Sequence, residues 1–223
     1  AALATLGQPN PGNAAGVILI GFDDAMVAKT GIASAFPGVP IARIAGGHDH
    51  NGDAVRSLDI AALTASIEAM SPSVTAFAIA GSFAVRNNGH EIAARDLVTK
   101  LTGKPVTLSS ELSNALDAPR RALTALLNAR LISRITHLIE AVRAAMDGLG
   151  IAGGLMVVKG DGTLANAESV ALRPIETVLS GPAASLVGAK WLAGCDDFIL
   201  SDIGGTTTDV AILSGGRPMV ATQ

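Results

Sequence analysis

The sequence predicts an α/β protein, in which helices cover the faces of a β-sheet. Apolar runs of strand length alternate along the chain with segments whose apolar residues recur at helical spacing. Hydrophobic residues make up 49% of the chain and aromatic residues only 3%, so small aliphatic side chains supply most of the apolar content. Such side chains are typical of strands that are buried on both faces. With 223 residues, the chain is long enough for one large domain or two small ones.

The first part of the chain is expected to alternate between strands and helices. An apolar run over residues 17–22 is predicted to be a strand, because turn-forming residues precede it. A second strand is expected over residues 40–44, and a polar loop over residues 46–53 comes next. Asp59 is expected to be the N-cap of the following helix, in which apolar residues recur every three or four positions up to Met70.

The alternation continues through the middle of the chain. Residues 74–80 are expected to form a buried strand, residues 89–101 a helix and residues 105–108 a short strand. The longest helix is predicted to run from Pro119 to about Gly148, with or without one break, because apolar residues form a stripe along it. Proline is well tolerated in the first turn of a helix.

The last third of the chain is expected to contain three more strands and a helix. The helix covers residues 182–193, with Ser180 and Gly181 at its start. The expected strands cover residues 155–159, 197–203 and 209–213. A turn rich in glycine and threonine joins the last two strands, so they are predicted to form a hairpin at the edge of a mixed sheet.

Composition argues against several classes of partner. The formal net charge of -3 and the isoelectric point of about 5.8 provide no field that attracts nucleic acid or an anionic membrane. Cys195 is the only cysteine, which excludes an intramolecular disulfide and a cysteine-based zinc site. The sequence has no signal-peptide pattern, and its apolar runs fall short of the ~20 residues of a membrane span. We therefore expect a cytoplasmic protein that binds neither nucleic acid nor membranes.

The turn between the last two strands has residues suited to binding phosphate. Gly204 and Gly205 have no Cβ, so their amides can approach an anion and their φ angles can be positive. The next three residues add hydroxyl donors: Thr206, Thr207 and Thr208. Asp202 and Asp209 flank the turn, where a carboxylate can hold the water shell of Mg²⁺ or orient a nucleophile.

An ordinary β-hairpin is the alternative, because Gly-Gly and threonine-rich turns are common in hairpins. Acidic residues on both sides of the turn make the pattern much narrower, and they favour phosphate binding. The segment is similar to the phosphate loops of the actin, Hsp70 and sugar-kinase superfamily.

Together with an upstream segment, this hairpin resembles the hydantoinase A/oxoprolinase family. In that family a Ser-Gly-Pro-Ala-Ala segment, here residues 180–184, precedes an Asp-Ile-Gly-Gly-Thr-Thr-Thr-Asp loop, here residues 202–209. Three further segments follow the order that the family shows: Phe83-Ala84-Val85-Arg86-Asn87 with His90-Glu91, Val106-Thr107-Leu108-Ser109, and Leu127-Asn128-Ala129. The resemblance covers roughly residues 45 to 223.

The resemblance implies an actin-like ATPase fold of the ribonuclease H-like type, with mixed sheets flanked by helices. It also implies an ATP-dependent hydrolase that phosphorylates a carbonyl oxygen, so that water can open a cyclic amide of the hydantoin or oxoproline type. ATP with Mg²⁺ would be bound by the loop, with Asp202 and Asp209 as catalytic residues. The expected partners are the cyclic amide or ketone substrate and a hydantoinase B-like subunit, and we expect a homo-oligomer.

The family's first phosphate loop, Asp-x-Gly-Gly-Thr-Phe-Thr-Asp, is absent from this sequence. The chain opens on Ala1 and ends on Gln223, so we expect an incomplete fragment that is inactive by itself, with apolar surface that is exposed or covered by a second copy of the chain. Residues 1–175 are expected to form the central α/β region, and residues 176–223 the start of the ATPase subdomain.

Two other functions remain open. The first is a subunit of an ATP-dependent ketone carboxylase, such as the acetone and acetophenone carboxylases that are related to this family. The second is a nucleotide-binding assembly or regulatory protein of the actin superfamily, in which the loop would serve binding without turnover. Filament formation with ATP, without consumption of a carbonyl compound, would select the second.

Histidines near the polar loop form a candidate metal site. His48 and His50 are two residues apart, which places both on one side of an extended segment, and Asp53 follows. His90 joins them if both loops open at the same edge of a parallel sheet. Two imidazoles and a carboxylate suit a transition metal such as Zn or Mn, and resemblance to the carboxylase branch implies a metal here. The alternative is a solvated turn, with His90 or Asn88 capping the following helix.

The start of the last helix also has two interpretations. Ser180 and Gly181 could present free backbone amides to an anion, as helix N-termini do. Capping of the helix explains a serine at this place equally well.

Overall fold

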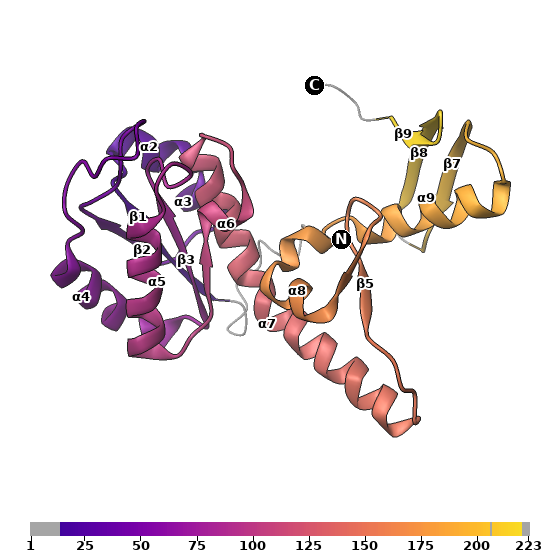
Figure 1. Cartoon of the computed structure of the whole chain (residues 1–223), viewed down its shortest axis with the longest axis horizontal. Coiled ribbons are helices and arrows are strands. Elements are labelled where there is room, and N and C mark those ends of the chain that lie inside the picture. Colours follow the sequence, from indigo (N-terminus) through magenta and orange to yellow (C-terminus); the bar gives the residue numbers. More distant parts are fainter. Residues whose placement is uncertain (1–13, 206, 220–223) are drawn as a thin grey trace. The chain divides into compact units, whose positions relative to one another are not determined.

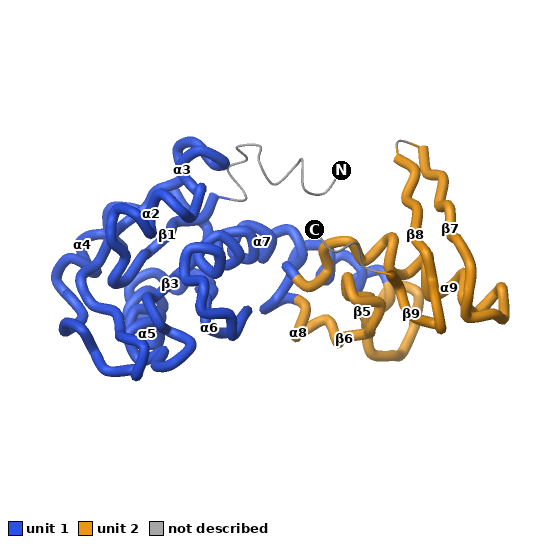
Figure 2. Tube along the Cα trace, turned by 90° about the horizontal axis from the view of Figure 1, so that it is seen from above, with its two compact units in different colours: residues 1–145, 171–175 blue, residues 146–170, 176–223 orange. Residues whose placement is uncertain are grey.

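A computed structural model describes residues 14–205 and 207–219, and Figure 1 shows its helices and strands. The described residues divide into two compact units, coloured separately in Figure 2. Unit 1 lies within residues 1–145 and 171–175, and unit 2 lies within residues 146–170 and 176–223. We describe each unit by itself.

A parallel sheet of four strands forms the centre of unit 1, in the order β2-β1-β3-β4. The strands are β1 (Ala15–Ile20), β2 (Ile41–Ile44), β3 (Ala76–Gly81) and β4 (Val106–Leu108). Every residue of the two central strands, β1 and β3, is buried, as expected for a sheet covered on both faces. These four strands confirm the prediction of an α/β protein and lie close to their predicted positions.

Helices connect the strands of unit 1 and cover the sheet. They are α2 (Asp24–Lys29), α3 (Ile32–Ala35), α4 (Ile60–Met70), the short 3₁₀ helix η2 (Ser71–Ser73), α5 (Gly89–Thr102), α6 (Ser109–Leu112) and α7 (Ala118–Gly148). The side chain of Asp59 caps α4 by accepting a hydrogen bond from the Ala62 amide at 2.9 Å, which confirms the predicted cap. Helix α7 is continuous over 31 residues, so the long helix is not broken.

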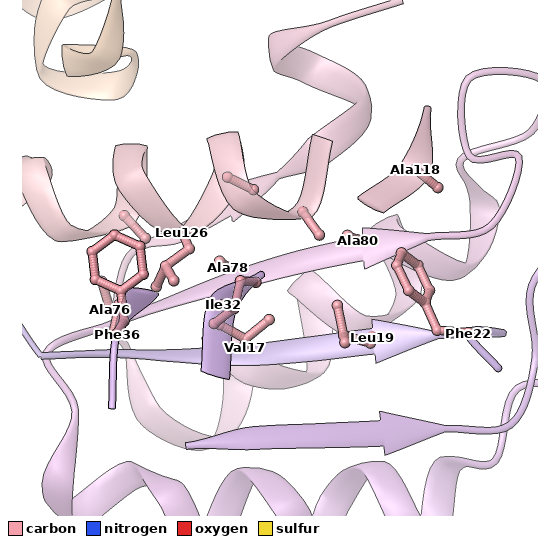
Figure 3. Close-up of a cluster of buried hydrophobic side chains, with 14 residues drawn as sticks. Val17, Leu19, Phe22, Ile32, Phe36, Ala76, Ala78, Ala80, Ala118 and Leu126 are labelled. Atoms are coloured by element: carbon pink, nitrogen blue, oxygen red, sulfur yellow. The ribbon is translucent and has the colours of Figure 1, made fainter. Parts of the chain in front are cut away.

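Two hydrophobic cores form because alternate residues of a strand point to opposite faces of the sheet. Figure 3 shows the first core, in which Val17 and Leu19 of β1 lie beside Ala76, Ala78 and Ala80 of β3. It also contains these residues of α7: Ala118, Ala122, Ala125, Leu126 and Ala129. Alanine on both surfaces lets the long helix approach the sheet closely. The second core joins Ile18 and Ile20, on the other side of β1, to residues of α4 and α5 that include Leu63, Ile67, Ala94 and Val98.

Unit 2 contains two antiparallel sheets. Its elements begin with the hairpin of β5 (Met156–Val158) and β6 (Leu164–Asn166), followed by α8 (Ala167–Leu172) and the 3₁₀ helix η3 (Pro174–Thr177), whose residues belong in part to unit 1. Next come α9 (Ser180–Ala193), β7 (Phe198–Ile203), β8 (Thr208–Ser214) and β9 (Arg217–Pro218). The last three strands form a sheet in the order β7-β8-β9.

The expectation of mixed sheets is wrong for the described residues. Strands of unit 1 are joined through helices that return the chain in the same direction, so all their pairings are parallel. In unit 2 short turns reverse the chain between consecutive strands, and the pairings are antiparallel. The predicted β7-β8 hairpin is present, but it belongs to an antiparallel sheet.

One face of the β7-β8 hairpin is apolar and exposed. Ile199 of β7 lies opposite Ile212 of β8, and these side chains are 71% and 45% exposed. Ile203 and Val210, on the same face, are exposed as well. The chain therefore presents apolar surface on this hairpin, as expected, and coverage of that surface by a second copy stays a prediction.

Within the described residues, none of the helices has both the length and the apolar composition that a bilayer crossing requires.

The turn of the β5-β6 hairpin yields a prediction about pH. Hydrogen bonds from the hydroxyl and the amide of Thr163, at 2.6 and 2.9 Å, lower the pKa of Asp161 from 3.8 to about 2. Because the folded state holds the lower pKa, this interaction stabilises the hairpin above pH 3.8, and the contribution is lost as the pH falls towards 2. Thr163→Val removes the hydroxyl donor, so we expect the pKa of Asp161 to rise towards 3.8. An NMR titration of the side-chain carboxyl carbon measures it, and a value that stays near 2 would contradict this assignment.

Candidate functional site

The turn between β7 and β8 is the first candidate site. The amide of Gly204 donates a hydrogen bond to the carbonyl oxygen of Thr207 at 2.9 Å, so this amide serves the turn itself. A Cβ on Gly205 would meet no atom within 4 Å, which leaves open space around that residue. Neither glycine uses its freedom to adopt a positive φ angle. Thr206 lies outside the described residues, and Thr208 is the first residue of β8.

Two carboxylates face each other at the base of this turn. Asp202 of β7 pairs directly with Asp209 of β8, so their side chains lie on the same face of the hairpin. Like charges in directly opposite positions destabilise a strand pair, whereas a cation between them reverses the effect. The hydroxyl of Ser185 in α9 donates a hydrogen bond to Asp202 at 2.6 Å. The arrangement suits a hard cation such as Mg²⁺, which prefers carboxylate oxygens and water as ligands.

The first turn of α9 lies near the same end of the hairpin. Ser185 is in the second turn of α9, and Asp202 is the last residue but one of β7, so their hydrogen bond places the beginning of the helix towards the Gly/Thr turn. The ribbon in Figure 1 follows this course, with the end of α9 leading into the start of β7.

No side chain caps α9. Its N-cap is Leu179, a residue with the left-handed φ of 65°, and Ser180 is already inside the helix. The capping interpretation of Ser180 is therefore wrong. A left-handed φ in a residue other than glycine is strained, and such strain is common where a ligand binds. The first-turn amides, including that of Gly181, are oriented as in helices that bind anions.

The second candidate site lies at the carboxyl ends of the parallel strands in unit 1. The imidazole rings of His48 and His90 are 4.3 Å apart between centroids, tilted by 35°. Nδ1 of His90 accepts a hydrogen bond from the Gly47 amide at 3.0 Å. The structure thus brings His90 next to the loop of residues 46–53, as the parallel arrangement predicts.

Burial changes the protonation of this pair. Desolvation lowers the pKa of His48 below 6.5, and the negative charges of Asp49 and Glu91 oppose part of that shift. Desolvation lowers the pKa of His90 as well, and the neighbouring His48 adds to the effect. Both rings are therefore expected to be neutral at pH 7.

The other two proposed metal ligands do not join the pair. The carboxylate of Asp49 accepts hydrogen bonds from the amides of Asn51 and Asp53, at 2.9 and 3.0 Å, and so closes a tight turn. The segment is therefore a turn and not an extended strand, and His50 is exposed whereas His48 is buried. Across residues 14–205 and 207–219, no three His, Cys, Asp or Glu side chains gather in a way that could hold a metal ion. The predicted set of four ligands does not fit a metal by itself.

The helix-cap alternative for this region is also wrong. Asn88 makes no side-chain cap to α5, and the side-chain oxygen Oδ1 of Asn87 accepts a hydrogen bond from the Gly89 amide instead. The side-chain amide of Asn87 reaches the carbonyl oxygen of Gly52 at 2.9 Å. This bond connects the loop after β3 to the loop that contains His48.

Two buried charged side chains, Glu91 and Arg121, bind the backbone at the end of β3, and sequence reasoning did not single them out. Glu91 accepts hydrogen bonds from the amide of Gly81 at 2.8 Å and from the side chains of Ser109 and Ser110. Arg121 donates to the carbonyl oxygen of the same Gly81 at 3.1 Å. Both side chains are 1% exposed. A charged residue inside the apolar stripe of α7 was the signal that could have revealed Arg121.

Comparisons with known proteins agree on one family. The model described as "Hydantoinase/oxoprolinase N-terminal region" matches residues 18–102, and the model described as "Hydantoinase/oxoprolinase" matches residues 121–223. The chain is 30% identical over 172 residues to caprolactamase subunit alpha of Pseudomonas jessenii, which is 75% of this chain and 25% of that protein.

Two solved structures have the same fold over most of this chain. ATP-dependent caprolactamase from Pseudomonas jessenii has a TM-score of 0.71 at 24% identity, covering 89% of this chain and 32% of that one. Nucleotide-free acetone carboxylase has a TM-score of 0.69 at 20% identity, covering 92% of this chain and 33% of that one. The chain therefore spans about a quarter to a third of the length of these relatives.

Proposed function

Since the chain belongs to the hydantoinase/oxoprolinase family, we propose that it forms part of an ATP-dependent enzyme that opens a cyclic amide. The β7-β8 turn would hold the phosphates of ATP, and the enzyme would transfer the terminal phosphoryl group to the amide carbonyl oxygen. We also propose that the intact enzyme has an actin-like ATPase fold. The similarity to a protein named ATP-dependent caprolactamase supports a cyclic amide as the substrate.

The observation that carries the proposal is the direct pairing of Asp202 with Asp209 at the base of a Gly/Thr turn. Two opposed carboxylates are costly in a plain hairpin, and a magnesium ion bound to phosphate would offset that cost. Nearby, the uncapped start of α9 supplies amides and a positive helix dipole for the same anion. The hydrogen bond from Ser185 holds Asp202 in position.

The chemistry needs an activated carbonyl because an amide is a poor electrophile. ATP supplies a phosphoryl group to the carbonyl oxygen, ADP leaves, and water then attacks the carbonyl carbon with release of phosphate and the ring-opened amino acid. In this scheme Asp202 and Asp209 would hold Mg²⁺, while Gly205, Thr207 and Thr208 would donate hydrogen bonds to phosphate oxygens. Ser180 and Gly181 would contribute amides from the start of α9. Phosphoryl transfer depends on such positioning and charge stabilisation.

The caprolactamase relative is named a subunit, so a partner chain is part of the proposal. We propose a hydantoinase B-like subunit that completes the hydrolytic step. Copurification of the intact protein with such a subunit tests this point. Full lactam turnover by the intact protein without a second subunit would contradict it.

A panel of carbonyl compounds tests the function. Phosphate release by the intact enzyme is measured with ε-caprolactam, hydantoin, 5-oxoproline, and acetone with bicarbonate. We expect release that depends on a cyclic amide. Release that depends on acetone and bicarbonate would make the protein a ketone carboxylase. ATP-dependent assembly without carbonyl consumption would instead place it among the binding proteins of the actin superfamily.

A further inference from the structure

The histidine pair lies where the connections of the parallel sheet diverge. In the order β2-β1-β3-β4, the strand β2 is on one side of β1 and β3 is on the other. Loops that leave the carboxyl ends of β1 and β3 therefore run apart, and ligands of open α/β sheets bind at such points. Gly21 follows β1, Ser82 follows β3, and the loop after β2 contains Gly47 and His48.

Backbone hydrogen bonds connect these three segments to one another. The amide of Ser82 donates to Ile20 at 2.9 Å, and the amide of His48 donates to the carbonyl oxygen of Ser82 at 3.2 Å. A Cβ on Gly47 would lie 2.3 Å from the hydroxyl oxygen of Ser82, so only glycine permits this approach. Phe83, the next residue, has a strained φ of 48°. The backbone around His48 is thus fixed in advance of any ligand.

The hydrogen bond from Gly47 sets the tautomer of His90. Since Nδ1 is the acceptor, the proton of the neutral ring is on Nε2, which is then a donor. His48, which is 5% exposed, stacks against this ring, and its own nitrogens have no hydrogen-bond partner among the described residues. These nitrogens are not fully enclosed by protein, so they and Nε2 of His90 have hydrogen-bonding capacity left for a ligand.

The charges around His48 indicate what kind of ligand the site can bind. The groups whose charges act on His48 are Asp49 and Glu91, both acidic, so the field disfavours a carboxylate or phosphate. A metal ion finds only two imidazoles, and one nitrogen of His90 is already engaged. A neutral molecule with a hydrogen-bond acceptor satisfies both limits.

We propose that the His48–His90 pair binds the carbonyl oxygen of a neutral small molecule, with Nε2–H of His90 as the donor. The ligand class is a lactam or a related cyclic amide, which rests on the proposed function. The pair would then be the substrate carbonyl site of unit 1, assembled on loops that the sheet and the Glu91–Arg121 contacts hold rigid.

NMR of the chain with ¹⁵N-labelled histidine rings tests the proposal, with ε-caprolactam as the probe. We expect the ring signals of His48 and His90 to shift with a dissociation constant on the order of millimolar, as one hydrogen bond and a small apolar ring allow. The exposed side chains of His50 and His137 serve as internal controls and should not shift.

His90→Asn separates binding from folding. The asparagine oxygen can replace Nδ1 as the acceptor for Gly47, but the variant has no donor at the position of Nε2. We expect a folded protein that binds the lactam about tenfold more weakly. Unshifted rings in the wild-type chain would overturn the proposal, and so would unchanged affinity in the variant. Tight Zn²⁺ binding by the two rings without any lactam response would also overturn it.

Mg·ATP binding at the β7-β8 turn is measured on the same sample and reports on the proposed function separately. Loss of the lactam response with an intact ATP response refutes this inference alone. The opposite pattern refutes the nucleotide function and leaves the carbonyl site in place.

Discussion

Replacing Glu91 by alanine is expected to destabilise unit 1 by about 3–5 kcal/mol, because it breaks a buried charged network. The carboxylate accepts from the Gly81 amide and from the side chains of Ser109 and Ser110, all of which lose a partner at once. Arg121 loses the nearby negative charge while it remains buried. Since Gly81 ends β3, the carboxyl end of the sheet is the region that loosens.

Hydrogen exchange of amides in β1 and β3 measures the opening free energy of unit 1 directly. Glu68→Ala is the matched control, because Glu68 is exposed on α4, and a surface change of this kind stays within about 0.5 kcal/mol. A loss below about 1 kcal/mol for Glu91→Ala would mean that water replaces the lost partners and that the network is not a structural clamp.

Replacing Asp209 by asparagine is expected to reduce ATP consumption by ~10²-fold or more in the intact enzyme, since positioned carboxylates contribute that much in phosphoryl transfer. The substitution keeps the shape of the side chain but removes one of the two opposed charges at the base of the turn. Mg²⁺ then keeps Asp202 alone as a carboxylate ligand. The rate of phosphate release at saturating lactam is the measurement.

Asp197→Asn is the control for that experiment. Asp197 precedes β7 and accepts a hydrogen bond from the Gly215 amide at 2.9 Å, so it lies at the opposite end of the same sheet. Asparagine can accept the same bond, and we expect turnover close to that of the wild type. Equal losses for both variants would show that damage to the fold, and not the chemistry at the turn, lowers the rate.

Local sequence patterns were sufficient to predict most of the secondary structure. The buried strands β1 and β3, the cap at Asp59 and the long helix α7 follow from apolar runs, a capping residue and helical periodicity. The β7-β8 hairpin follows from its Gly/Thr turn between two apolar runs. The short elements α2, α3 and β6 were not predicted, because three to six residues carry too little periodicity.

The side-chain geometry of the sites depended on contacts that no local pattern reveals. The carboxylate of Asp49 closes a turn after His48, and His50 is exposed whereas His48 is buried, although the spacing predicted both on one side of an extended segment. The partner of His90 is the backbone amide of Gly47, 43 residues earlier in the chain. Leu179 takes the cap position expected for Ser180, in a conformation that leucine rarely adopts. In each case a tertiary contact or backbone conformation differs from what the local sequence predicts.

The central claim is that the β7-β8 turn binds the phosphates of ATP, and amide chemical shifts of the ¹⁵N-labelled chain during a titration with Mg·ATP test it most directly. We expect weak binding, with a dissociation constant on the order of millimolar, because the chain spans only about a third of the length of these relatives. The amides of Gly205, Thr207 and Thr208 should shift together with those of Ser180 and Gly181, and Asp209→Asn should abolish the response. Shifts confined to other parts of the chain, or an equal response in the variant, would contradict the account.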